Sequence, residues 1–384
     1  MMVLSLVLFV LVILGGIYGL LSLVCVVGFF GKPGPHGHAP SAGTDEPLAV
    51  SVLKPIKGID PSCSENLFSF CIQDYPRYEV LFGFREADDP AIPLVKGIVD
   101  QARCDARIVV KDVGSGANQK VLNLMALAVE SRYPMLALSD SDMVVDKDYL
   151  RHIVAEYRRG KKTGIVTSLY KISRPPSVGS ALESLTIALD FIPSVLVARQ
   201  LEGVTFGLGA SILVSKEALL DVGGLGPIAD YLADDYQLGF RLWQRGYENI
   251  LSRHVIENRV GSMSIAAHLR HQVRWARTYR ASRPKGFLGY GITHIFPLAL
   301  LLLWTNPHTG SFVLMGLVLA LRYVLALVLY GKVIKAREWL RWLFLIPFKD
   351  ALGFLVWLFS LAGSKVHWRG SHYRVIRGGK IVRV

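Results

Sequence analysis

Two carboxylates, Asp140 and Asp142, stand directly after an apolar run in the stretch MLALSDSDMVVD (135–146). Carboxylate oxygens are the ligands that hard ions such as Mg²⁺ prefer, and one or two suffice when substrate phosphates and water fill the other positions. An acid-x-acid pair at the end of a strand therefore suits a nucleotide diphosphate with its metal, Mg²⁺ or Mn²⁺. Taken alone, the pair fits equally well a polar turn that caps the next helix.

A second acidic pair opens the segment YLADDYQLGFRLWQRGY (231–247), whose apolar residues recur at helical spacing. Asp234 fits the N-cap of that helix. Asp235, one residue further on, is a candidate general base, because a carboxylate that points into a cleft can accept a proton from a bound substrate. A plain helix start remains the alternative.

The stretch SIAAHLRHQVRWARTYRASR (264–283) contains no Pro or Gly and predicts a long helix. His271, Arg274 and Trp275 are spaced at i, i+3 and i+4, so they share one face. Arg274 could bind a diphosphate with both arms of its guanidinium, and Trp275 could stack on a sugar or a ring. The alternative is a basic amphipathic helix on anionic lipid, and the two roles can coexist on different faces.

Several enzyme classes lack their defining motifs here. The glycine-rich segment GVTFGLGASILVS (203–215) has no phosphate-loop spacing, so we expect it to provide a close backbone approach at a cleft instead. The chain contains no GxSxG, HExxH or kinase motif set, which excludes the common hydrolases and kinases. The net charge of +13 comes without zinc-finger or RNP-type motifs, which favours a membrane surface over nucleic acid.

Apolar runs typical of strands alternate with stretches typical of helices through the middle of the chain. The expected strands are 48–54, 78–84, 106–111, 135–140 and 163–170. The expected helices between them are 65–73, 89–102, 118–132 and 146–160. Continuous apolar strands that alternate with helices predict an α/β domain on a mainly parallel sheet. Ligands bind beyond the carboxyl ends of such strands, which is where Asp140 and Asp142 lie.

The ends of the chain are composed for a membrane. Hydrophobic residues make up 52% of the sequence, charged residues only 19%, and the mean hydropathy is +0.38. Residues 1–31 carry no charge and could span a bilayer, with the N-terminus outside and the next domain on the cytoplasmic side. Segments 287–304 and 311–330 read as a hairpin that leaves and returns, because basic loops mark the cytoplasmic side.

The apolar stretch 342–362 differs from the others because Lys349 and Asp350 lie near its middle and Pro347 interrupts its helix. A charged pair in a straight span is costly. We therefore expect a re-entrant or interfacial element, with a straight span that carries a paired charge as the alternative. The tail 363–384 contains six Lys or Arg and no acid, which predicts a cytoplasmic location.

The motifs, taken in order, resemble one membrane-bound family. They are VSVLKPIKG (50–58), READDPAI (85–92), NQKVLNLM (118–125), SDSD (139–142), ADD (233–235) and HQVRW (271–275). This order resembles the ceramide glucosyltransferase family of GT-A glycosyltransferases, from about residue 48 to 285. Within it, the chain is similar to hopanoid-biosynthesis glycosyltransferases that add N-acetylglucosamine to bacteriohopanetetrol.

The resemblance implies roles for individual residues. Asp140 would contact the nucleotide-sugar, Asp142 would hold a divalent metal (Mn²⁺ or Mg²⁺), and Asp235 would be the general base. Arg274 and Trp275 would match the end of a Q/R-x-x-R-W motif.

Three further positions complete the expected substrate-binding set. Lys120 of NQKVLNLM is expected to bind substrate. Glu86 is favoured over Asp88 and Asp89 to face the nucleotide, since it ends an apolar run. His271 departs from the family motif, which has Gln or Arg there; histidine can still donate a hydrogen bond, but its charge depends on pH.

The resemblance also implies the reaction: an inverting transfer from a UDP-sugar to a lipid hydroxyl, by a multi-pass protein of the cell inner membrane whose catalytic domain faces the cytoplasm. N-acetylglucosamine transfer to bacteriohopanetetrol is the first expectation, ceramide glucosylation the second. A non-enzymatic membrane-surface scaffold is the alternative from another class, but it would not need acids at cleft positions. The expected regions are an anchor (1–31), a linker (32–47), a GT-A domain (48–285), membrane segments (286–362) and a basic tail (363–384).

Overall fold

A computed structural model describes residues 2–31 and 46–384. These residues form two compact units, each discontinuous in sequence. We call residues 46–171 and 202–261 the sheet unit, and residues 2–31, 172–201 and 262–384 the helical unit. The expected GT-A range 48–285 includes parts of both units, and most of the linker expected over 32–47 lies outside the described residues.

The sheet unit is built on one sheet with the strand order β3-β2-β1-β4-β7-β6-β8-β5. Its strands are β1 (Val50–Pro55), β2 (Tyr78–Phe84), β3 (Asp105–Val110), β4 (Met135–Leu138), β5 (Met143–Val144), β6 (Thr163–Lys171), β7 (Ile212–Ser215) and β8 (Glu248–Asn258). The pairings β3–β2–β1–β4 and β6–β8 are parallel, whereas β7 runs antiparallel to β4 and β6, and β5 to β8. The α/β prediction is confirmed, and the sheet is mixed.

All five expected strands are present within a few residues of their predicted bounds. Four of them are buried apolar runs, whereas β3, at the edge of the sheet, is only partly buried. The register pairs Val50 with both Tyr78 and Met135, and Leu53 with Leu138. The carboxyl ends of β1, β2 and β4 therefore open on the same edge of the sheet, and the polar residues that follow them meet there.

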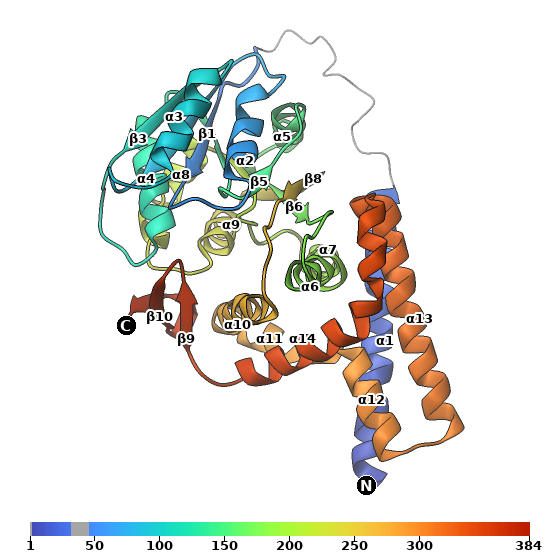
Figure 1. The fold of residues 1–384 in the computed structure, drawn as a ribbon. Helices are drawn as coiled ribbons and strands as arrows, with labels where there is room; N and C mark the ends of the chain where they lie inside the picture. The colour runs from blue at the N-terminus through green and yellow to red at the C-terminus, as the bar shows by residue number, and fades with distance from the viewer. Residues whose placement is uncertain (1, 32–45) are drawn as a thin grey trace. The chain divides into compact units, whose positions relative to one another are not determined.

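Helices cover the sheet and complete its core (Figure 1). They are α2 (Cys63–Phe68) with η1 (Ser69–Ile72), α3 (Ile92–Gln101), α4 (Gln119–Glu130), α5 (Tyr149–Tyr157), α8 (Lys216–Asp221), η3 (Gly226–Ile228) and α9 (Asp234–Gln244). Helix α4 packs on β1, β2 and β3, and α9 packs on β6 and β8. One buried cluster joins Leu53 and Leu138 of the sheet to Leu124 of α4 and Leu238 of α9, which fixes the starts of these two helices near the same edge.

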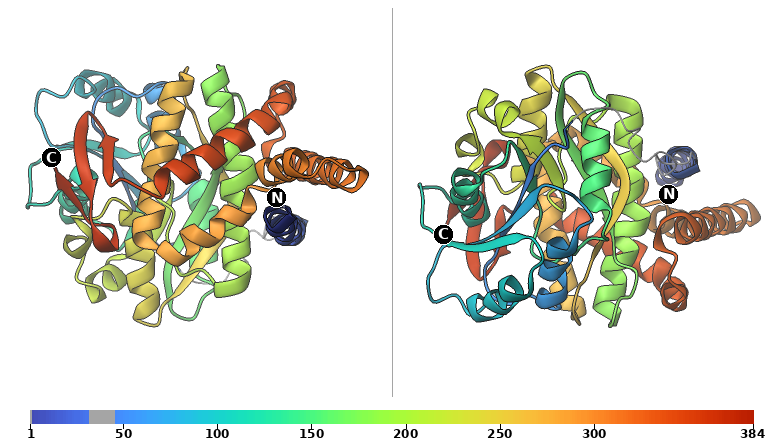
Figure 2. Two further views of the ribbon diagram at one scale, coloured as in Figure 1. Left: turned by 90° about the horizontal axis from the view of Figure 1, so that it is seen from below. Right: turned by 90° about the horizontal axis from the view of Figure 1, so that it is seen from above.

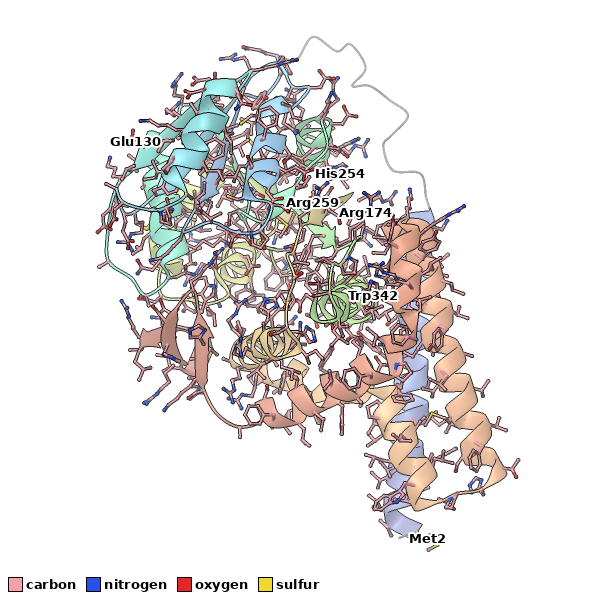
Figure 3. All side chains as sticks on the ribbon, in the orientation of Figure 1. Met2, Glu130, Arg174, His254, Arg259 and Trp342 are labelled. Carbon is pink, nitrogen blue, oxygen red and sulfur yellow. The ribbon has the colours of Figure 1, made fainter. Side chains whose placement is uncertain are left out.

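The helical unit is a bundle with a small sheet at the C-terminal end of the chain (Figure 2). Its helices are α1 (Met2–Gly31), α6 (Val178–Thr186), η2 (Ile187–Phe191), α7 (Ile192–Glu202), α10 (Ile265–Ser282), α11 (Pro284–Tyr290), η4 (Gly291–Thr293), α12 (Ile295–Thr305), α13 (Thr309–Leu329), η5 (Tyr330–Ile334), η6 (Arg337–Leu345) and α14 (Ile346–Ser360). Helices α1, α12 and α13 pack together, and their outward side chains are apolar (Figure 3).

Among the described residues, four helices are long and apolar enough to cross a membrane. They are Met2–Gly31, Val178–Glu202, Thr309–Ile334 and Arg337–Ser360, and a bent pair, Pro284–Thr293 with Ile295–Thr305, would be a fifth. The bend of 58° interrupts the first helix of the expected hairpin. The segment Val178–Glu202 was not predicted from sequence; most of it is buried inside the helical unit.

The basic tail forms a sheet rather than an irregular segment. Strands β9 (Lys365–Trp368), β10 (Ser371–Val375) and β11 (Ile381–Arg383) pair antiparallel, with the turn η7 (Arg377–Gly379) between the last two. Arg277 and Arg280 of α10 donate to the carbonyls of Lys365, Ser360 and Gly363, which ties the long basic helix to the start of this sheet.

Four charged side chains form a buried cluster in the helical unit. Arg322 of α13 donates from Nε to Asp350 Oδ2 at 2.8 Å and from Nη2 to Asp190 Oδ1 at 3.0 Å. Lys349 Nζ lies 2.5 Å from Asp190 Oδ2 and 2.8 Å from Asp350 Oδ1. The two cations and two carboxylates balance, so the charges near the middle of 342–362 are paired within the protein.

The position of α14 bears on the membrane path of 342–362. This helix packs against α10, α12 and α6 inside the helical unit. Pro347 stands in its first turn, where a missing N–H costs least, so the helix begins there instead of breaking. The re-entrant or interfacial path stays a prediction.

Removing one member of the buried charge cluster around Arg322 should destabilise the fold. In Arg322→Met, Asp190 and Asp350 face Lys349 alone and leave one buried negative charge uncompensated, so we expect a loss of about 3–5 kcal/mol in the free energy of unfolding. Urea titration of the detergent-solubilised protein measures it. Arg337→Met, at an exposed arginine, is the control and should unfold like the wild type. Equal stability of the two variants would contradict a structural role for the cluster.

Candidate functional site

The carboxylates that follow β4 point into the edge of the sheet unit rather than toward a helix start. Asp140 Oδ1 lies 2.6 Å from Lys120 Nζ, and Asp142 Oδ2 accepts a hydrogen bond from Asn258 Nδ2 at 3.0 Å. Neither side chain caps α5, whose N-cap position is held by Asp148. The two acids therefore contact Lys120 and Asn258 at the edge of the sheet, and they do not form a polar turn that caps the next helix.

A buried lysine, Lys54, holds the loop that follows β4, and sequence reasoning missed it. Lys54 of β1 is fully buried, and its Nζ donates to the carbonyl of Asp140 and lies 3.9 Å from the centroid of the Phe70 ring. Burial lowers the pKa of Lys54 to about 7, although the nearby Asp140 and Asp142 carboxylates oppose that shift. A lysine at the end of an otherwise apolar strand was the signal that could have identified it.

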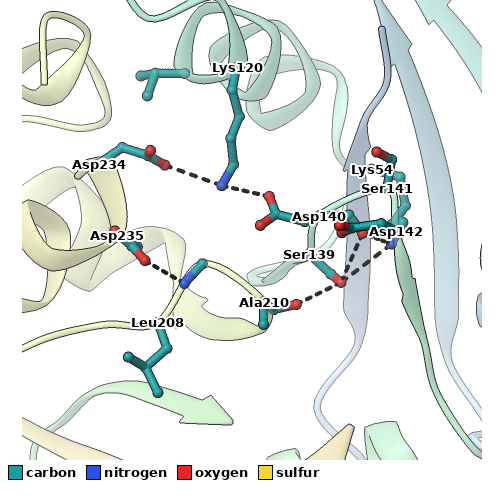
Figure 4. A network of polar contacts seen from close by, with 12 residues as sticks. Lys54, Lys120, Ser139, Asp140, Ser141, Asp142, Leu208, Ala210, Asp234 and Asp235 are labelled. Atoms are coloured by element: carbon teal, nitrogen blue, oxygen red, sulfur yellow. Dashed lines mark hydrogen bonds and ion pairs between the residues drawn. The ribbon is translucent and has the colours of Figure 1, made fainter. Parts of the chain in front are cut away.

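Lys120 links the first acidic pair to the second (Figure 4). It stands in the first turn of α4, and its Nζ lies 3.4 Å from Asp234 Oδ2 as well as beside Asp140. Burial opposes a charged ammonium, but Asp140 and then Asp234 outweigh it and hold the pKa of Lys120 above its ordinary value. Lys120 therefore stays protonated at neutral pH.

The start of α4 is fixed by an asparagine that also contacts the second acidic pair. The Asn118 side chain accepts from the backbone N–H groups of Lys120 and Val121, which caps the helix. Its Nδ2 donates to the carbonyl of Tyr231 at 2.7 Å and to Asp234 Oδ1 at 3.2 Å. Asp234, which we expected as an N-cap, makes no capping bond; it opens α9 and is held by Asn118 and Lys120 instead.

Asp235 is held by backbone donors. Its Oδ2 accepts from the N–H of Gly209 at 2.6 Å, and its Oδ1 accepts from the N–H of Tyr236 at 2.8 Å. Burial, together with the charge of Asp234, raises the pKa of Asp235 to about 6, and the Lys120 cation moderates the rise. A carboxylate with a pKa near 6 is ionised at neutral pH and can accept a proton, which is the property a general base needs.

Some of these groups line a narrow, partly open cavity in the sheet unit. Its polar lining includes Lys120, Asp234 and Asp235, and its apolar lining includes Leu124 and Leu138. Gly209 lies among them, because a Cβ at this position would sit 3.1 Å from Asp235 Oδ2 and 3.2 Å from Lys120 Nζ. The glycine-rich segment thus provides the close backbone approach expected of it.

The acidic segment READDPAI (85–92) lies after β2, on the same edge of the sheet. Glu86 is exposed and lies 3.5 Å from Lys57 Nζ, which follows β1. Asp89 is buried and accepts from the N–H groups of Gly58 and Ala91, so it holds the loop after β1 in place. Glu86 and Asp88 are both exposed, so exposure excludes only Asp89 as a ligand contact, and the choice of Glu86 stays a prediction.

The three residues expected on α10 belong to the helical unit. His271 Nδ1 lies 2.8 Å from Glu183 Oε1, and its ring packs edge-on against Trp275 with centroids 4.9 Å apart. Arg274 lies between them on the helix, and its carbonyl accepts from Thr278. The structure thus brings together Lys120, Asp140 and Asp235 in one unit and His271 and Trp275 in the other. Glu183 gave no sequence signal.

The residues around Asp142 fit a metal that is shared with a substrate better than one enclosed by protein. The described residues contain no group of three or more His, Cys, Asp or Glu side chains arranged to hold an ion. A Mg²⁺ or Mn²⁺ ion that takes one protein carboxylate and several phosphate and water oxygens needs no such group. Asp142 offers that carboxylate, whereas Asp140 is paired with Lys120.

The sequence profile of glycosyl transferase family 21 matches residues 7–381. The chain belongs to this family. The family resemblance drawn from the ordered motifs is therefore confirmed.

Curated relatives of the chain carry a common activity in their names. Ceramide glucosyltransferase 3 of Caenorhabditis elegans is 28% identical over 260 residues, covering 67% of this chain and 56% of that protein. Ceramide glucosyltransferase 1 of the same nematode is 29% identical over 236 residues, covering 61% of this chain and 50% of that protein. The chain thus spans about half the length of these relatives.

A solved structure shares the fold. The mannosyltransferase PcManGT from Pyrobaculum calidifontis, in complex with GDP-Man and Mn²⁺, is 17% identical, with a TM-score of 0.54, covering 93% of this chain and 99% of that chain. At this identity the likeness establishes the fold alone. The predicted GT-A fold with flanking apolar helices is confirmed.

The role given to Asp142 can be tested through metal affinity. We expect Asp142→Asn to weaken Mn²⁺ binding in the presence of UDP by about tenfold or more, because the change removes the charged oxygen that the ion would contact. Electron paramagnetic resonance of free Mn²⁺ measures this affinity. Asp148→Asn, at an exposed acid beside α5, should bind like the wild type. Unchanged affinity in Asp142→Asn would remove Asp142 as a ligand.

Proposed function

We propose that the protein is a membrane-bound inverting glycosyltransferase that moves a sugar from a nucleotide-diphosphate sugar, most simply a UDP-sugar, to a hydroxyl group of a lipid. The observation that carries this proposal is the Asp235 carboxylate, held by two backbone N–H groups in a cavity that it shares with Lys120 and Asp234. Membership of glycosyl transferase family 21 supports the reaction class.

The chemistry assigned to Asp235 follows from its surroundings. Its pKa of about 6 leaves it ionised at neutral pH, so it can take the proton of the acceptor hydroxyl while that oxygen attacks the anomeric carbon. The bonds to Gly209 and Tyr236 fix the carboxylate without protonating it. One base and no covalent sugar intermediate give inversion at the anomeric carbon.

Positive charge for the leaving diphosphate comes from this chain's own residues. Lys120 is charged and accessible from the cavity, so a phosphate group can share it with Asp140. A divalent ion held by Asp142 would neutralise further charge on the diphosphate. Glu86 is proposed to face the nucleotide. Arg274 and Trp275 are proposed to contact the donor on the strength of the motif order, with His271 in the family's Gln or Arg position.

The acceptor is proposed to be a ceramide-type lipid. The relatives with the longest matches given above are named ceramide glucosyltransferases, which favours the second of the two lipid expectations. Transfer of N-acetylglucosamine to bacteriohopanetetrol, the first expectation, has no support from these relatives. The four helices of the described part of the chain that are apolar enough to span a membrane fit a lipid acceptor, and the cytoplasmic face and inner membrane remain part of this proposal.

The general-base assignment predicts a pH profile. Because the ionised form of Asp235 is the active one, kcat/KM should rise with pH through about 6 and fall tenfold per unit below it. Measurement from about two units above to one unit below this pKa traces the profile. A profile with no inflection in that range would contradict the assignment.

Substitution at Asp235 gives an independent test. Asp235→Asn should lower kcat by about 10²–10⁴-fold, because the amide cannot accept the proton, while UDP binding stays near the wild-type value. Titration of UDP binding and steady-state kinetics measure the two quantities. Asp221→Asn, at an exposed acid at the end of α8, is the matched control and should retain full activity. Full activity in Asp235→Asn would eliminate the base.

The acceptor proposal is tested by direct competition of substrates. Membranes that contain the protein are incubated with labelled UDP-glucose or UDP-N-acetylglucosamine and with either ceramide or a polyhydroxylated hopanoid. We expect glucose transfer to ceramide. Transfer of N-acetylglucosamine to the hopanoid alone would overturn this acceptor, and transfer to neither lipid would overturn the lipid glycosyltransferase itself.

A further inference from the structure

A buried asparagine at the end of β8 contacts the carboxylate to which we assign the metal. Asn258 is the last residue of this strand, and only 7% of its surface is exposed. Its Nδ2 donates to Asp142 Oδ2 at 3.0 Å, across 116 residues of sequence. Asn258 carries no charge and lies outside the acidic segments and the HQVRW motif, so the sequence alone does not associate it with the site.

The end of β8 is paired with the loop that carries Asp142. Asn258 lies opposite Met143 in the antiparallel β5–β8 ladder. The N–H of Arg259, the next residue, donates to the carbonyl of Asp142 at 3.2 Å. The contact between the Asn258 amide and the Asp142 carboxylate therefore follows from the pairing of the two strands.

The backbone of the same loop has other supports. Ser139 Oγ donates to the carbonyl of Ala210 at 2.9 Å (Figure 4). Ser141 Oγ donates to Asp60 Oδ2 at 2.6 Å, and the side chain of Ser141 is buried. These bonds hold the loop on either side of its acids without the Asn258 side chain. The bond from Asn258 therefore bears on the orientation of one carboxylate rather than on the path of the loop.

Two other buried asparagines of the sheet unit use their amides differently. Asn123 Nδ2 donates to the carbonyl of Gly83, and Asn249 Nδ2, in β8 itself, donates to the carbonyl of Gly239, both at 2.8 Å. Such bonds satisfy backbone groups and hold elements together. In all three asparagines Oδ1 is buried and has no partner among the described residues, so only the donor is used. Asn258 differs because its donor holds a carboxylate.

We propose that Asn258 is a positioning residue for the divalent ion, because its amide N–H fixes the Asp142 carboxylate in the orientation that contacts the ion. This proposal rests on the metal role that the proposed function gives to Asp142. A carboxylate has about four lone-pair sites, so one hydrogen bond leaves room for an ion. Carboxylates that bind metals are commonly held by a second residue in this way.

The chemistry of the amide suits this task. Asp140 is paired with the Lys120 cation, which neutralises its charge, whereas the Asn258 amide is neutral and orients Asp142 without cancelling its charge. Orientation matters most where protein supplies a single carboxylate and the remaining ligands are phosphate and water oxygens, because no second protein ligand corrects a misplaced one. Asn258 therefore prepares Asp142 for the ion before the ion arrives.

Metal affinity tests the proposal without turnover. Asn258→Leu keeps the size and branching of the side chain but removes the donor, so Mn²⁺ affinity in the presence of UDP should fall by about tenfold or more. Electron paramagnetic resonance of free Mn²⁺ with the full chain in detergent measures it. Asn249→Leu is the matched control: it lies in the same strand, is 6% exposed, loses one amide bond and should bind Mn²⁺ like the wild type. Unchanged affinity in Asn258→Leu, or an equal loss in both variants, would overturn the proposal.

A double-mutant cycle separates a positioning role from a merely structural one. If Asn258 acts through Asp142, its donor has little effect once the carboxylate is gone. The double variant, Asp142→Asn with Asn258→Leu, should therefore bind Mn²⁺ within about twofold of Asp142→Asn alone. Losses that multiply in the double variant would show that Asn258 acts independently of Asp142, and would overturn the positioning role.

A second variant keeps the test valid if Asn258→Leu does not fold. Asn258→Ala removes the amide without placing an apolar branch beside the carboxylate, and its Mn²⁺ affinity should fall in the same way. Urea titration of each variant establishes that it is folded. Wild-type Mn²⁺ affinity in folded Asn258→Ala would overturn the proposal.

This proposal and the proposed function fail separately. If the wild type glycosylates a lipid and Asp142→Asn loses Mn²⁺ affinity while Asn258→Leu does not, the positioning role fails and the function stands. If the wild type transfers no sugar to lipid but Asn258→Leu loses Mn²⁺ affinity relative to Asn249→Leu, the function fails and the positioning role stands. If the wild type binds no more Mn²⁺ than UDP alone does, the metal role of Asp142 and the positioning role of Asn258 both fail.

Discussion

Charge balance around Lys120 is the constraint on which the cavity of the sheet unit depends. Three acids approach Lys120 at one edge of the sheet, Asp140 from the end of β4 and Asp234 and Asp235 from the start of α9. Without a cation among them, their mutual repulsion in a partly buried space would favour protonation or separation. Lys120 lies 2.6 Å from Asp140 and 3.4 Å from Asp234, so it lets the acids stay close and leaves Asp235 able to titrate near neutral pH.

In the buried charge cluster of the helical unit, the acids are balanced by an equal number of cations. There, Arg322 and Lys349 pair fully with Asp190 and Asp350, and no charge is left over for a ligand. In the sheet unit one lysine faces three acids, so a metal ion or an incoming diphosphate changes the balance. The first arrangement holds the helices together without a net charge, and the second suits binding and release of a charged nucleotide.

Much of the sheet unit could be predicted from the sequence, because buried strands and amphipathic helices are local patterns. The five expected strands and the capped start of α4 follow from runs of apolar residues and from Asn118. The polar partners could not be predicted in the same way. Lys54 contacts the Asp140 loop across more than eighty residues, and Glu183 contacts His271 across a similar separation. Such contacts are set by tertiary packing. The sheet of the basic tail was missed because its charge was interpreted only as a sign of location, and no helix was predicted over 178–202.

The unusual histidine at position 271 follows from such a contact. Glu183 is buried, with Oε1 facing His271 Nδ1 at 2.8 Å and Oε2 facing His268 Nδ1 at 2.7 Å and Gln272 Nε2 at 3.0 Å. A buried carboxylate needs donors on both oxygens, and histidine, glutamine and arginine can each supply one. The requirement at this position is therefore a donor toward Glu183 rather than one particular side chain, and histidine meets it while its ring still packs against Trp275. The departure from the family motif is thus compatible with an intact α10 face.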